Sequence, residues 1–137
     1  MTKINATKGE FVNLINGLFK VQTLQGKEFG LKVSKNLKRI QEALKDLEEM
    51  GTPSEEFMKL AREVNALANQ GTEDAQAQVK KLEEENKALV EERQAQMEKV
   101  TECMKDSLEL ELEIIPEDLL PDNITAQQIT GIQKIIE

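Results

Sequence analysis

The chain of 137 residues is long enough for one domain with a modest core and too short for two conventional ones. Its residues are 39% hydrophobic but only 3% aromatic, so the core is expected to consist of aliphatic side chains and methionine. The absence of histidine, the single cysteine and the net charge of −8 exclude an ordinary zinc site, a histidine base and an intramolecular disulfide, and argue against binding of the whole chain to nucleic acid.

The first two helices are predicted over residues 7–25 and 31–50. Thr7 and Glu10 form a capping box at the start of the first, because each side chain can accept a hydrogen bond from the other residue's backbone amide. The apolar residues of the second alternate in steps of four and three, which is typical of a helix packed on another helix: Val33, Leu37, Ile40, Leu44 and Leu47.

The third and fourth helices are predicted over residues 53–69 and 73–107. Thr52 is expected to cap the third helix with Pro53 at its first position. Its apolar stripe comprises Phe57, Leu60, Ala61, Val64, Leu67 and Ala68. Gly71 is expected to end the third helix and Thr72 to begin the fourth. The fourth helix would be about 50 Å long at 1.5 Å per residue.

The fourth helix carries the predicted oligomer seam. An apolar stripe of this length lacks an obvious partner within the chain, so we expect a coiled coil and self-association into a homo-oligomer. Two polar residues interrupt the seam, and they would either fix its register or simply be exposed to solvent. The seam comprises Leu82, Asn86, Leu89, Arg93, Met97, Val100 and Met104.

A strand and a short helix are predicted at the C-terminal end. Residues 108–115 alternate leucine or isoleucine with glutamate, which indicates a half-buried strand. Residues 2–5 are the only other candidate strand in the chain, and another subunit would be the alternative partner. Thr125 and Gln128 form a second capping box, which predicts a helix over 125–136.

Together these elements predict a mainly α fold in a single elongated domain covering residues 1–137. We expect an antiparallel helical hairpin or bundle with a long coiled-coil helix and a minor two-stranded β element. No apolar stretch is long enough to cross a bilayer, and the N-terminus lacks the apolar run of a secretory signal. A cytoplasmic protein is therefore expected.

A candidate anion site lies in the basic N-terminal part of the chain. Residues 1–40 carry eight Lys or Arg and two acids, whereas residues 41–137 carry ten and 24. Lys27, Lys32, Lys35 and Arg39 recur near the apolar face of the second helix and could together hold a phosphate or a nucleotide. The alternative is that this basic face docks on the acidic part of the chain.

Other residues with chemical potential have simpler structural explanations. The glutamates of the fourth helix radiate around it and are expected to form a solvated face rather than a metal site. Cys103 lies beside Met104 in an apolar stripe and has no histidine to activate it, so it is expected to be a packed side chain. We therefore expect neither a metal, nor a cofactor, nor an enzymatic activity.

The layout resembles that of small helical-hairpin proteins of unknown function encoded by tailed bacteriophages. The residues that carry the resemblance are Lys3 to Asn5 with Thr7 to Phe11, and Leu110 to Leu120 with Ile124 to Ile136. The resemblance implies a phage origin, a host-cell cytoplasmic location and an accessory role. It assigns a function to no individual residue.

Two functions fit these expectations. In the first, an oligomer sequesters a host-defence protein or a nucleotide-derived immune signal stoichiometrically, which would make it an anti-defence protein. In the second, the chain is a phage structural or assembly protein, a chaperone or scaffold that docks through its coiled coil and an exposed strand. We expect no membrane and no sequence-specific nucleic-acid partner in either case.

Overall fold

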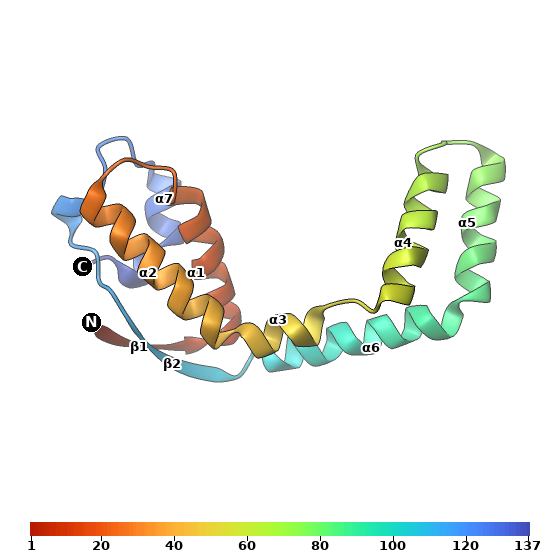
Figure 1. Ribbon diagram of the computed structural model, residues 1–137, viewed down its shortest axis with the longest axis horizontal. Helices are drawn as coiled ribbons and strands as arrows, with labels where there is room; N and C mark the ends of the chain where they lie inside the picture. The colour runs from red at the N-terminus through yellow and green to blue at the C-terminus, as the bar shows by residue number, and fades with distance from the viewer. The chain divides into compact units, whose positions relative to one another are not determined.

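The computed structural model describes residues 1–137 (Figure 1). It contains seven α-helices and one two-stranded sheet, which confirms the predicted mainly α fold with a minor β element. The chain forms two compact units where one domain was expected. The first unit comprises residues 1–47 and 102–137, and the second unit comprises residues 48–101.

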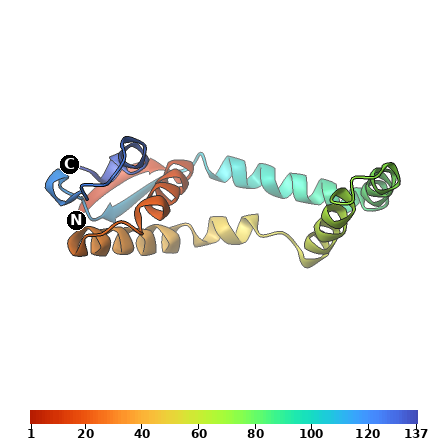
Figure 2. The same cartoon turned by 90° about the horizontal axis from the view of Figure 1, so that it is seen from above.

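The sheet of the first unit joins the two ends of the chain. Strands β1 (Thr2–Thr7) and β2 (Ser107–Leu112) pair antiparallel, with Ile4 opposite Leu110. Figure 2 shows the two strands side by side. The predicted pairing within one chain is therefore confirmed. The regular strand ends at Leu112 rather than at residue 115, because the backbone of Glu113 is hydrogen-bonded to a helix side chain instead of to β1.

The helices α1 (Lys8–Val21), α2 (Lys27–Ala43) and α7 (Ala126–Gly131) lie on one side of this sheet (Figure 1). Successive side chains of each strand therefore alternate between buried and exposed positions: Ala6 and Leu112 are buried, whereas Lys3 and Glu111 are exposed. The helices and the segments after β2 supply most of the buried core: Phe11, Leu14, Leu18, Val21, Phe29, Val33, Leu37, Ile40, Ile115, Ile132 and Ile135.

Both predicted capping boxes are present. Thr7 and Glu10 exchange hydrogen bonds of 3.1 and 3.2 Å at the start of α1, and Thr125 and Gln128 do so at the start of α7. Helix α7 ends at Gly131 instead of residue 136. The residues that follow cannot continue the helix, because the Ile135 carbonyl and the Glu137 amide bond to the backbone of Ile115.

The predicted helices over 7–25 and 31–50 have different limits in the structure. The first ends at Val21, and the second begins at Lys27 and is interrupted at Leu44, after which α3 (Lys45–Gly51) continues. Leu44 keeps the helical hydrogen bond to Ile40 but has φ −98° and ψ 9°, so the interruption covers a single residue.

The second unit contains the hairpin of α4 (Glu55–Ala68) and α5 (Glu73–Glu85). Gly71 has a φ of +66° in the turn, a conformation that glycine adopts without steric cost. Thr72 caps α5 as predicted. The predicted N-cap of α4 was wrong. The Ser54 hydroxyl accepts a hydrogen bond from the Phe57 amide and caps the helix, whereas the Thr52 hydroxyl donates a hydrogen bond to the Glu48 carbonyl.

The predicted long helix over 73–107 is broken at Asn86 into α5 and α6 (Lys87–Cys103), and Figure 1 shows a sharp bend between them. The Asn86 side chain donates to the Leu82 carbonyl at 2.9 Å and its backbone has φ −114° and ψ 27°. Asparagine disfavours a helix interior because its side chain competes for backbone groups in this way.

Candidate functional site

Two of the four basic residues of the predicted anion site are paired with an acid of the chain. In the first unit, Lys32 Nζ lies 3.4 Å from Glu113 Oε2, and Arg39 Nη1 lies 3.9 Å from Glu113 Oε1. Lys27 and Lys35 are exposed to solvent. Two of the four cations thus face an acid of the same chain, which agrees with the alternative that the basic face docks on the acidic part.

Asn36 fixes this docking through the backbone. Its side chain is fully buried on α2, where it donates to the Glu113 carbonyl at 2.9 Å and accepts from the Glu113 amide at 2.7 Å. A primary amide reproduces the donor and acceptor pair that a neighbouring strand would offer. The segment after β2 is therefore held against α2 by hydrogen bonds that do not depend on charge.

The Glu113 carboxylate is tuned by two opposing influences. Desolvation is the largest single one and raises the pKa of Glu113, but the hydrogen bond from Lys32 and the charges of Lys32, Lys35 and the N-terminus together lower that pKa below its ordinary value of 4.5. The pKa of Glu10 is also lowered, first by its hydrogen bond from Lys134, whose Nζ lies 2.7 Å away. Both carboxylates are therefore stabilised in their charged form.

These lowered pKa values predict acid sensitivity of the first unit. A carboxylate with a folded-state pKa below its unfolded value stabilises the fold above about pH 4.5, and this contribution is lost as the pH falls through the folded value. The variant Glu113→Gln should be less stable than the wild type near pH 7, and the difference should narrow below pH 4.5. Urea unfolding of both proteins across this pH range measures the effect, and a constant difference would contradict it.

The residues of the predicted oligomer seam are mostly half-buried in the single chain. Val100 is buried, and most of the remaining seam positions are half-buried. Only Met97 is exposed, with 41% of its surface accessible. The half-buried seam positions are Leu82, Asn86, Leu89, Arg93 and Met104.

Arg93 contacts the backbone at the end of α3. Its Nη1 donates at 2.8 Å to both the Gly51 carbonyl and Gln96 Oε1, and its guanidinium lies over the Phe57 ring at 5.7 Å. Gln96 Nε2 donates to the carbonyls of Met50 and Thr52. The two side chains thus satisfy three consecutive carbonyls that have no partner at the end of α3.

Removal of this arrangement should destabilise the second unit. We expect Arg93→Met to lower the free energy of unfolding by about 1 to 3 kcal/mol, because the Gly51 carbonyl loses a charged donor. Arg62→Met is the matched control, since Arg62 is exposed on α4 and makes no hydrogen bond or ion pair. Urea unfolding followed by circular dichroism compares them. Equal stability of the two variants would show that the arrangement contributes nothing.

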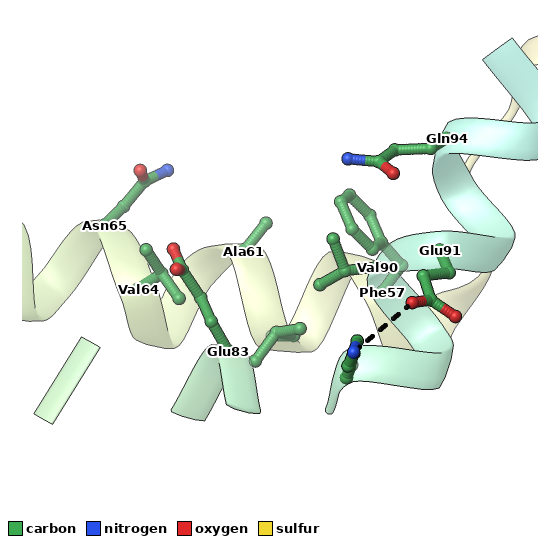
Figure 3. A pocket seen from close by; sticks show the side chains of 10 residues that line it. Phe57, Ala61, Val64, Asn65, Glu83, Val90, Glu91 and Gln94 are labelled. Atoms are coloured by element: carbon green, nitrogen blue, oxygen red, sulfur yellow. Dashed lines mark ion pairs between the residues drawn. The ribbon is translucent and has the colours of Figure 1, made fainter. Parts of the chain in front are cut away.

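An apolar groove lies in the second unit between α4, the end of α5 and the start of α6 (Figure 3). Its volume is about 550 Å³. Among its lining residues Leu60 is buried, whereas Phe57, Ala61 and Val64 of α4 and Val90 of α6 are only half-buried. The stripe of α4 was predicted from the sequence, but it is not fully covered by its own unit.

The polar residues of the groove lie around its apolar part. Figure 3 shows Glu83 reaching from α5 towards Val64, and Glu91 of α6 paired with a neighbouring lysine. That lysine, Lys87, lies 3.9 Å from Glu91, and both side chains are more than half exposed, so the pair is weak. Asn65 and Gln94 complete the lining. The groove therefore combines an open apolar surface with a polar, acidic margin.

The remaining candidates contain no reactive constellation. Cys103 lies 3.5 Å from Lys8 Nζ in the first unit and is half-buried. At no place do three or more Cys, Asp or Glu side chains gather closely enough to hold a metal ion. None of the helices is long and apolar enough to cross a membrane.

Comparisons of the chain with protein-family models, with curated protein sequences and with solved structures find no match.

Proposed function

We propose that the protein is non-enzymatic and acts by binding a partner protein, with the groove of the second unit as the contact surface. The observation that supports this is the half-buried apolar stripe of α4, which faces about 550 Å³ of open space beside Val90. Accessible apolar surface in a concave site with a polar margin is typical of binding sites.

The groove supports the proposal better than the basic face or the seam does. A nucleotide at the basic face would have to compete with Glu113 for Lys32 and Arg39. A homo-oligomer built on the seam would have to separate Arg93 from the backbone of its own chain. Binding at the groove requires neither change.

Both expected biological settings are compatible with this contact. A phage-encoded anti-defence protein that sequesters a host protein and a phage assembly protein that chaperones a client would each need a stoichiometric, apolar docking site. We place the action in the cytoplasm, where the thiol of Cys103 stays reduced. The groove is common to both settings, so it is the part to test first.

The test uses a synthetic amphipathic helix of about five turns, with leucine on one face and glutamine on the other. We expect it to bind the wild type, and Ala61→Gln to weaken binding at least about tenfold by placing a polar side chain in the groove. Ala66→Gln is the matched control, because Ala66 is an exposed residue of the same helix outside the groove. Fluorescence anisotropy measures the affinities.

A wild type that does not bind the peptide, or equal affinities of the two glutamine variants, would reject the groove as the contact surface. Circular dichroism of both variants confirms that a change in affinity is not caused by unfolding.

A further inference from the structure

We propose that the occupant of the groove is the apolar face of a basic amphipathic helix that belongs to a partner protein. This inference rests on the proposed function and adds the secondary structure and the charge of the partner.

The groove walls require an occupant that satisfies its own backbone hydrogen bonds. The walls are formed by the helices α4, α5 and α6, whose backbone amide and carbonyl groups are paired within the helices, and this pairing continues across the break at Asn86. They therefore offer no strand edge to which an extended peptide could add. A helix pairs its own backbone groups, and it can place an apolar face against the half-buried residues Phe57, Val64 and Val90.

The charges around the groove favour a cationic occupant. Glu83 makes no ion pair, and Glu91 makes only the weak pair with Lys87. The surrounding unit, residues 48–101, carries 13 Asp or Glu and seven Lys or Arg, a net charge of −6. Lysine or arginine beside the apolar face of the occupant would meet this acidic margin, which raises both affinity and association rate.

The same charge argues against a second copy of the groove as the occupant. Two grooves facing each other would bring together two units of net charge −6, and like charges placed opposite each other are destabilising. A basic helix of another protein faces no such repulsion.

The first experiment compares two versions of the synthetic helix in which the glutamines are replaced by lysines or by glutamates. At low salt the wild type should bind the lysine version at least about tenfold more tightly than the glutamate version. This preference should shrink as added salt screens the charges. Fluorescence anisotropy gives both affinities. Equal affinities for the lysine and glutamate versions would overturn the charge part of the inference and leave the proposed function intact.

The second experiment separates a local effect from the overall acidity of the chain. Glu83→Gln with Glu91→Gln removes two charges at the groove, and Glu63→Gln with Glu98→Gln removes two exposed charges of α4 and α6 outside it. The first double variant should bind the lysine helix about three- to tenfold more weakly than the second. Equal weakening would overturn the inference, because the attraction would then be a property of the whole chain.

The third experiment tests the requirement for a helix. A proline placed at the centre of the lysine version prevents a continuous helix without changing the charge. We expect this peptide to lose binding at least about tenfold. Retention of its affinity would overturn the helical part of the inference, whereas the failure of every peptide, helical or not, would count against the proposed function itself.

Discussion

Replacement of Gly17 by alanine is expected to lower the free energy of unfolding by about 3 kcal/mol, at the upper end of the usual cost of overpacking. A Cβ at position 17 would collide with the carbonyl oxygen of Gly131 and would lie 2.7 Å from its carbonyl carbon. These are backbone atoms of α7, so no side-chain rotation can relieve the contact. Helix α7 would have to move away from α1.

Two other glycine variants provide the controls. Gly30→Ala on α2 meets nothing within 4 Å and should stabilise the protein by about 0.5 to 1 kcal/mol, as expected of alanine in a helix interior. Gly131→Ala should have an intermediate effect, because its Cβ would lie 3.3 Å from the Gly17 Cα. Urea unfolding measures all three, and a Gly17→Ala protein as stable as Gly30→Ala would show that the two helices can separate at little cost.

Local signals in the sequence predicted much of the fold. Capping boxes act within four residues, and the alternation of Leu108 to Ile114 follows from the period of a strand, so both are readable without tertiary structure. The pairing of β2 with the N-terminal stretch was also predicted, because the chain contains no other candidate strand.

The features that were not predicted depend on interactions between segments far apart in the sequence. The interruptions at Leu44 and Asn86 lie within apolar patterns that continue on both sides, so the pattern alone predicted longer helices. Asparagine at position 86 was recognised, but as a polar residue of a seam and not as a break. The contact of Gly17 with Gly131 joins residues far apart in the sequence, and no local pattern indicates it.

The residues of the candidate sites were also predicted from local patterns, whereas their partners in distant segments were not. The sequence predicted that the basic residues of α2 form either an anion site or a docking face, and the partner, Glu113, is separated from Lys32 by 81 positions. The stripe of α4 was predicted residue by residue. Whether its own unit covers the stripe depends on the bend after α5, and this bend leaves Val64 and Val90 facing a groove instead of a closed seam.

The second large effect is expected for Asn36→Leu, which should lower the free energy of unfolding by about 2 to 4 kcal/mol. Leucine has a similar size but cannot bond to the Glu113 amide and carbonyl, and each backbone group left without a partner costs about 1 to 3 kcal/mol. The gain from burying an apolar side chain offsets only part of this loss.

Asn16→Leu is the matched control, because the same chemical change is made at an exposed position of α1 and should alter stability by less than about 0.5 kcal/mol. Urea unfolding gives the difference, and hydrogen exchange locates it, since the Glu113 amide should exchange faster only in Asn36→Leu. If that amide stayed protected while stability fell, the loss would come from packing around α2. The docking of the segment after β2 would then depend on the ion pairs of Lys32 and Arg39 with Glu113, whose strength, unlike that of the amide hydrogen bonds, changes with pH.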